Sequence, residues 1–137
     1  MWRANGLGEL YAYLPINDQN TQQLLAVPPR SINNPDFGVS AGRGAFTFPA
    51  GQWVTVTERI KLNDPGSFDG EITIWFNGAK VIDVGGLMLR DSLDSVIQGT
   101  HFSTFFGGST VDWATPVDQR AWFADVSGAI ITGRTVD

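Results

Sequence analysis

The stretch EITIWFNGAKVIDV, residues 71–84, carries the clearest fold signal in this sequence. Two short runs rich in β-branched and aromatic residues, 71–76 and 79–84, flank the pair Asn77-Gly78. Both residues of an Asn-Gly pair accept positive φ, so the pair favours a two-residue β-hairpin turn. The first run alternates Ile72, Ile74 and Phe76 with polar or amphipathic neighbours, as expected of a strand with one buried face.

Further short apolar runs on both sides of this hairpin predict more strands, at residues 44–48, 52–62, 96–106 and 119–131. Residues 16–39 are polar and contain prolines, so we expect a long surface excursion there, with a short helical turn at 22–26. No internal repeat or domain boundary is visible. The sequence therefore predicts a single all-β domain over residues 1–137, an antiparallel β-sandwich.

The composition excludes several classes of function. A formal net charge of −5 argues against a nucleic-acid partner, which needs a basic surface. The absence of cysteine excludes disulfides and thiolate metal sites, and a single histidine excludes a histidine-rich metal centre. No apolar run reaches the roughly 20 residues of a membrane span, and the first residues lack a signal-peptide pattern. We expect no cofactor; a structural calcium site would have to use the scattered Asp83, Asp118 and Asp125.

The stretch GELYAYLP, residues 8–15, also alternates as a strand does. One face carries apolar side chains and the other carries a carboxylate and two phenols, namely Leu10, Ala12 and Leu14 against Glu9, Tyr11 and Tyr13. These are the only two tyrosines of the chain. The apolar face belongs to the core, and the opposite face is a candidate for function.

Two other strands show a similar mixture on their polar faces. Residues 52–62 place Arg59 and Lys61 there, and residues 71–76 place Trp75 there. One interpretation is that single aromatic rings on a solvated sheet simply add cross-strand packing. The other is a sugar-binding groove, in which rings stack on the C–H face of a pyranose and polar groups form directional hydrogen bonds. Arg59 and Lys61 would suit an acidic sugar, because they can pair with a carboxylate.

Three segments carry a family resemblance: WRANGLGELYAYLP, FPAGQWVTVTERIKLNDPGSFDGEITIWFNGAKVI and FSTFFGGSTVDWATPVDQRAWFADVSGAI. Together they resemble the carboxyl-terminal part of the polysaccharide lyase domains of family 14, common in fungi, with the glucuronan lyases of family 20 as relatives. The resemblance implies a secreted β-jelly roll whose concave sheet binds an anionic uronate polymer, such as alginate or glucuronan. It also implies cleavage of that polymer by β-elimination.

The same resemblance places the paired catalytic tyrosines of the family on Tyr11 and Tyr13. Because the reference pKa of tyrosine is about 10, a nearby Arg or Lys would have to favour the phenolate of a catalytic base. His101 is a further candidate base, since imidazole titrates near neutrality. Candidate substrate contacts are Arg3, Glu9, Arg59, Lys61 and Trp75.

The chain also departs from the family pattern. The resemblance implies a further catalytic lysine and a Ser-x-Arg motif on strands before the tyrosine strand, whereas Met1 lies only ten residues before Tyr11. We therefore expect a sandwich truncated at its N-terminus, with exposed sheet edges that could pair in a homo-oligomer. Two other functions stay open: a non-catalytic carbohydrate-binding protein (a lectin) that uses the same face, and a secreted interaction protein that keeps only the fold.

Overall fold

The computed structural model describes residues 1–131 of this chain. The chain divides into two compact units, Met1–Gln98 and Gly99–Asp137, and each is described by itself. Residues 132–137 of the predicted domain lie outside the described residues. The organisation as a single domain stays a prediction.

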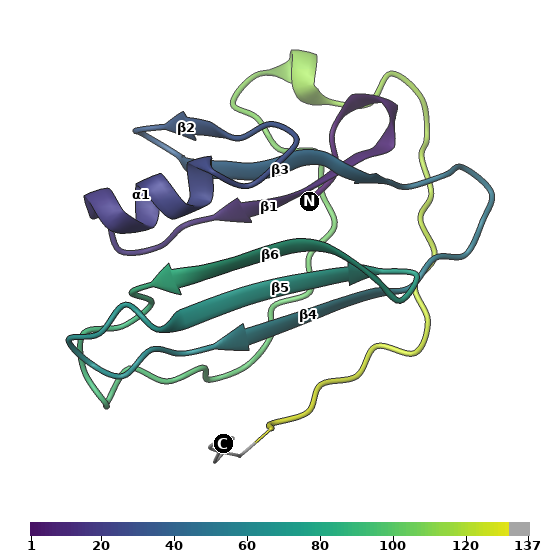
Figure 1. The fold of residues 1–137 in the computed structure, drawn as a ribbon. Coiled ribbons are helices and arrows are strands. Elements are labelled where there is room, and N and C mark those ends of the chain that lie inside the picture. The colour runs from purple at the N-terminus through teal and green to yellow at the C-terminus, as the bar shows by residue number, and fades with distance from the viewer. Residues whose placement is uncertain (132–137) are drawn as a thin grey trace. The chain divides into compact units, whose positions relative to one another are not determined.

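The first unit contains two three-stranded antiparallel sheets, which Figure 1 shows as two layers. The first sheet has the order β1-β3-β2, with β1 at Leu7–Ala12, β2 at Ile32–Asn34 and β3 at Gly38–Thr47. The second has the order β4-β5-β6, with β4 at Val56–Lys61, β5 at Gly70–Phe76 and β6 at Ala79–Leu87. These two sheets confirm the predicted antiparallel β-sandwich.

The predicted hairpin joins β5 to β6. Asn77 and Gly78 have φ of 50° and 80°, and Phe76 pairs with Ala79 across the turn. Because positive φ at both central residues matches the twist of the flanking strands, this turn fixes the register of the pair. Ile72 and Ile74 are buried, as the alternation predicts.

The core lies between the two sheets and takes residues from both. The first sheet contributes residues such as Leu10, Ala12 and Phe46, and the second contributes residues such as Ile74 and Ile82. The ring centroids of Phe46 and Phe76 lie 5.0 Å apart, so an aromatic contact joins the two layers. Aromatic pairs at this separation add about 0.5–1.5 kcal/mol to the effect of burial.

Residues 16–39 contain more regular structure than the sequence predicts. An α-helix, α1 at Asp18–Leu25, begins after Asn17, whose side chain accepts a hydrogen bond from the Asn20 N–H at 2.8 Å. Asparagine is a preferred residue at this capping position because its side-chain oxygen satisfies a free N–H of the first turn. The predicted turn at 22–26 is thus the second half of a helix, and its Leu24 is part of the core.

The predicted strands 96–106 and 119–131 are wrong. Within the described residues, the part of the second unit at 99–131 contains one short 3₁₀ helix, Val111–Trp113, and no strand. A strand is stabilised by pairing with another strand, and neither segment pairs with one in the described part of the chain. A short apolar run is therefore not sufficient to predict a strand in this part of the chain. No described helix combines the length and the apolar character needed to span a membrane.

Candidate functional site

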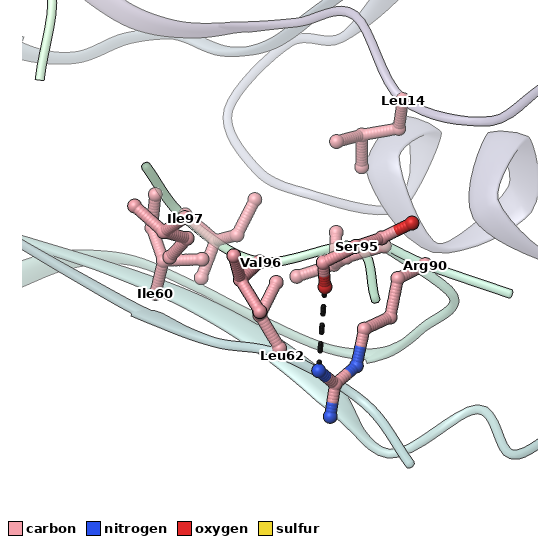
Figure 2. Close-up of a pocket in the computed structure, with 9 residues that line it drawn as sticks. Leu14, Ile60, Leu62, Arg90, Ser95, Val96 and Ile97 are labelled. Atoms are coloured by element: carbon pink, nitrogen blue, oxygen red, sulfur yellow. Dashed lines mark hydrogen bonds between the residues drawn. The ribbon is translucent and has the colours of Figure 1, made fainter. Parts of the chain in front are cut away.

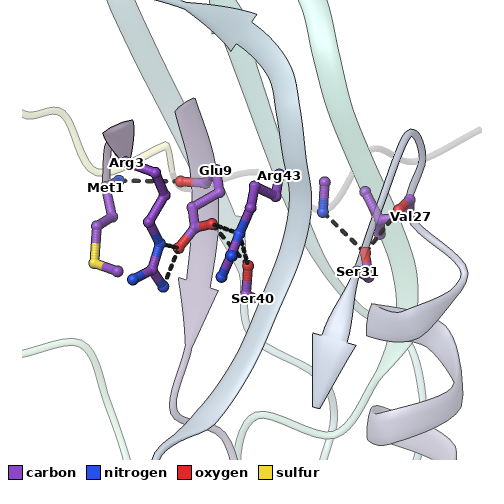
Figure 3. A network of polar contacts seen from close by, with 8 residues as sticks. Met1, Arg3, Glu9, Val27, Ser31, Ser40 and Arg43 are labelled. Atoms are coloured by element: carbon purple, nitrogen blue, oxygen red, sulfur yellow. Dashed lines mark hydrogen bonds and ion pairs between the residues drawn. The ribbon is translucent and has the colours of Figure 1, made fainter. Parts of the chain in front are cut away.

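Glu9 is the centre of a polar network (Figure 3). Because Leu10 and Ala12 of β1 belong to the core, Glu9 lies on the opposite face of the first sheet. Its carboxylate accepts hydrogen bonds from Arg3 Nε at 2.8 Å, from Ser40 Oγ at 2.7 Å and from Arg43 Nε at 2.9 Å. Arg3 Nη2 lies 2.7 Å from the same oxygen, Oε1, that Arg3 Nε contacts. The Glu9 side chain is fully buried, whereas both guanidinium groups remain partly exposed. Glu9 therefore orders two arginines at the protein surface.

A bulge in β3 makes this arrangement possible. Gly8 pairs with Phe46 and Leu10 pairs with Ala41, so residues 42–45 of β3 all lie opposite Glu9. Gly42 and Gly44, on either side of Arg43, have φ of 65° and 88°, a region that favours glycine. Bulges redirect side chains, and this one brings Arg43 to the Glu9 carboxylate.

Sequence reasoning missed Arg43. The signal that could have found it is the triplet Gly42-Arg43-Gly44 inside a strand, because paired glycines there indicate a bulge next to a redirected side chain. Of the three guanidinium nitrogens of Arg43, only Nε has a hydrogen-bond partner among the described residues. Its two terminal nitrogens are therefore available to a ligand.

The electrostatics of Glu9 favour the charged carboxylate. Burial alone would raise the pKa of Glu9, but the hydrogen bonds from Arg3, Ser40 and Arg43 outweigh burial and hold the pKa below its usual value. One buried negative charge faces two guanidinium groups, so the cluster has an excess of positive charge. Such an excess suits the carboxylate of an acidic ligand.

The two tyrosines lie beside this cluster. The ring centroids of Tyr11 and Tyr13 are 5.1 Å apart, and the Arg3 guanidinium carbon lies 5.4 Å from the Tyr11 centroid. Burial, followed by the neighbouring Tyr13 phenol, raises the pKa of Tyr11 above its usual value, and Arg3 offsets this only in part. Tyr11 is therefore a protonated phenol at neutral pH in the free protein. We call this surface, made of Arg3, Glu9, Tyr11, Tyr13 and Arg43, the tyrosine face.

The other predicted substrate contacts lie elsewhere. Arg59 and Lys61 of β4 both pair with Glu71 of β5, at 2.8 and 3.1 Å, and Trp75 lies on the same side of β5. Because Ile72 and Ile74 of β5 point into the core, this side is the outer face of the second sheet. The expectation of one groove shared by all three strands is thus wrong, because β1 belongs to the first sheet and the outer faces of the two sheets point in opposite directions. A role of Arg59, Lys61 and Trp75 in binding stays a prediction for a separate surface.

Four sequence candidates remain, one histidine and three aspartates. His101 belongs to the second unit, where it is exposed and outside any helix or strand. Asp83 accepts a hydrogen bond from Thr73 and pairs with Lys80. Within residues 1–131, no three acidic or histidine side chains gather as metal ligands would.

A hollow of about 260 Å³ opens in the first unit, and Figure 2 shows the residues that line it. Its walls are mainly apolar and include Leu14, Ile60 and Val96. The guanidinium of Arg90 is engaged there, because Nε donates to the Asn63 carbonyl at 2.7 Å and Nη1 to the Ser95 carbonyl at 3.3 Å. This hollow therefore offers no set of free polar groups to a sugar. A smaller hollow of about 170 Å³ adjoins Tyr13.

Comparison with known proteins links the geometry to a family. A family model described as polysaccharide lyase 14 matches residues 1–126. The chain is also similar to the crystal structure of the marine PL-14 alginate lyase from Aplysia kurodai, with 34% sequence identity and a TM-score of 0.69. The match covers 84% of this chain and 44% of that chain, so this chain spans less than half of its length. A search of curated proteins gives no match. The structural similarity confirms the predicted jelly-roll fold class.

Proposed function

This chain belongs to the polysaccharide lyase 14 family, and we propose that its tyrosine face binds an anionic uronate polysaccharide and cleaves it by β-elimination. The observation that supports the proposal is the pair of tyrosines beside two arginines that a buried glutamate orders. Membership in the family supports a polysaccharide as the substrate. The uronate and the reaction type are our inference from the charge and chemistry of the face.

The arginines meet the first demand of the reaction. Elimination needs the C5 proton of the uronate to become acidic, which requires a positive group at the sugar carboxylate to stabilise the charge that develops. Arg43 suits this role because its terminal nitrogens have no partner in the described part of the chain. A guanidinium binds a carboxylate through two parallel hydrogen bonds, so it also fixes the orientation of the ring.

The tyrosines meet the second demand, the movement of two protons. A base takes the C5 proton, and the electron pair of the broken C5–H bond forms the C4–C5 double bond. The C4–O bond then breaks, and the leaving oxygen gains a proton. Because its pKa is raised, Tyr11 is the proton donor to the leaving oxygen. Tyr13 is then the base.

The experiment that tests this proposal measures the ultraviolet absorbance of the new double bond on incubation with alginate and with glucuronan. We expect product with at least one polymer, and Tyr11→Phe and Tyr13→Phe to lower the rate about a hundredfold or more. Trp53→Phe, at an exposed ring outside the tyrosine face, is the control and keeps the rate. Full activity in both tyrosine variants, with unfolding temperatures unchanged, would refute the catalytic assignment.

A second candidate is a non-catalytic carbohydrate-binding protein that uses the same face. It is favoured by the geometry of the face, because two aromatic rings beside two guanidinium groups can stack on a sugar and pair with its carboxylate without any proton transfer. Under this alternative, alginate or glucuronan raises the unfolding temperature of the folded chain and no double bond forms. An extracellular location follows from the action on a polysaccharide and is part of the proposal. A fungal source and the relation to family 20 stay predictions.

A further inference from the structure

We propose that the hollow beside Tyr13 is a subsite for one sugar ring of the polysaccharide, next to the ring whose carboxylate meets Arg43. This inference rests on the proposed function and adds a second binding position to it. The hollow lies between the end of β1, the start of α1 and the turn that joins β2 to β3. Tyr13, Asp36 and Phe37 are among the residues that line it.

The aromatic side chains supply a platform for stacking. Phe37 is 60% exposed and Tyr13 is 73% exposed, although both rings are large and mainly apolar. The turn that carries Phe37 is held by two hydrogen bonds, from the Phe37 N–H to the Asn34 carbonyl and from the Asp36 N–H to Asn34 Oδ1, both at 3.1 Å. Phe37 is thus an exposed ring on an ordered turn, which suits stacking on the C–H face of a pyranose.

A polar side chain of the hollow, Asp36, favours sugar hydroxyls over a sugar carboxylate. Asn20 and Thr21 are already engaged, because Asn20 Nδ2 donates to the Pro15 and Met88 carbonyls and Thr21 Oγ1 donates to the Asn17 carbonyl. Asp36 is exposed, and its carboxylate accepts no hydrogen bond from the described residues. A free carboxylate accepts hydrogen bonds from sugar hydroxyls and repels a uronate carboxylate. We infer that the ring bound here turns its own carboxylate away from Asp36.

The hollow shares Tyr13 with the tyrosine face and has room for a single ring. Tyr13 belongs to both, since its ring centroid lies 5.1 Å from that of Tyr11. Gly38 permits this position, because a Cβ there would lie 3.2 Å from Tyr13 Cδ1 and 2.5 Å from the Ala12 carbonyl oxygen. Drug-sized ligands occupy pockets of about 300–1,000 Å³. At about 170 Å³ this hollow suits one sugar unit.

The test is calorimetric titration with alginate oligosaccharides of increasing length, carried out in the Tyr11→Phe background so that the ligand is not cleaved. We expect affinity to increase at the length that adds a ring beyond Tyr13. Phe37→Ala removes this increase, a loss of about two- to tenfold in affinity, and Asp36→Ala reduces it. Phe37→Trp restores the increase because it restores a stacking ring. Phe68→Ala, at an exposed phenylalanine outside the hollow, is the matched control and leaves it unchanged.

The outcomes separate the two proposals. If the oligosaccharides bind and the increase with length survives in Phe37→Ala, the subsite is refuted while the proposed function stands. If no oligosaccharide binds and the wild-type chain forms no product from alginate or glucuronan, the proposed function fails and the subsite fails with it. An increase that Phe68→Ala removes as well would also overturn the assignment to this hollow.

Discussion

Glu9 shows how one residue organises the tyrosine face. It lies on the polar side of β1 next to the aromatic residues, yet its side chain is fully buried, so it is not free to contact a substrate. Its carboxylate instead holds Arg3 and Arg43 in place. An ordered guanidinium loses less conformational entropy when it binds a carboxylate. Glu9 is therefore better described as a positioning residue than as a substrate contact.

The buried Glu9 carboxylate should make the stability of the chain depend on pH in the acid range. Because the folded pKa of Glu9 is lowered, this group contributes stability above its unfolded pKa of about 4.3, and the contribution is lost as the pH falls through the folded value. Glu9→Gln should therefore lower the free energy of unfolding at neutral pH by about 2–4 kcal/mol and by less in acid. Urea unfolding measured from neutral to acidic pH checks this expectation.

The matched control for Glu9→Gln is Glu71→Gln. Hydrogen bonds from Arg59 and Lys61 lower the pKa of Glu71 as well, but this group and both its partners are well exposed. Exposed ion pairs contribute about 1 kcal/mol or less, so Glu71→Gln should change stability only slightly. Equal effects of the two variants would show that burial of Glu9 has no special role.

At the scale of elements, buried asparagines connect segments that strand pairing leaves separate. Asn63, after β4, accepts hydrogen bonds at Oδ1 from the Leu89 and Arg90 N–H groups, at 2.7 and 2.9 Å. Its Nδ2 donates to the Ser67 and Arg90 carbonyls, at 3.1 and 2.9 Å. Asn20 of α1 bonds both backbone polar groups of Met88 in the same way. The two side chains anchor the segment after β6 to a loop and to the helix.

We expect Asn63→Ala to lower the free energy of unfolding by about 2–4 kcal/mol. The substitution leaves several buried backbone groups without partners, and each costs about 1–3 kcal/mol unless water replaces the lost bond. Thermal and urea unfolding measure the change. Asn33→Ala, at an exposed position of β2, is the control and should stay within about 0.5 kcal/mol of the wild type. A loss for Asn63→Ala no larger than for Asn33→Ala would contradict this account.

At the scale of the whole molecule, the net charge and the local charge have opposite signs. The chain carries a formal charge of −5, which repels an anionic polymer, whereas the tyrosine face presents two guanidinium groups around one carboxylate. Beyond a Debye length of about 8 Å at physiological salt, the repulsion is largely screened. Under the proposed function, binding of a uronate polymer therefore depends on where the arginines lie and little on the total charge.

A pair of variants with the same net charge tests this distinction. Arg43→Gln should weaken binding of alginate oligosaccharides about ten- to hundredfold, because it removes a charged hydrogen-bond partner of the sugar carboxylate. Lys80→Gln, on β6 of the second sheet, removes the same charge and should change affinity less than about twofold. Calorimetry at physiological salt compares the two. Similar losses would mean that long-range charge decides binding.

The sequence by itself determined the features that depend on neighbours along the chain. The Asn77-Gly78 hairpin, the buried alternation of β5 and the polar face of β1 all follow from local turn chemistry and from a side-chain period of two residues. Those signals were sufficient for an antiparallel β-sandwich and for placing the two tyrosines together on one face. The capping Asn17 is equally local, but the first half of the helix was not predicted, because its polar residues are also typical of a loop.

Only the tertiary structure decided which faces belong to the same surface. Alternation assigns a side to each residue of a strand, but it does not say which sheet the strand joins, because strand pairing is a contact between distant residues. Arg59 and Lys61 therefore lie away from the tyrosines, while Arg43 reaches Glu9 through a bulge. For the same reason the apolar runs at 96–106 and 119–131 could not be told from strands by pattern alone.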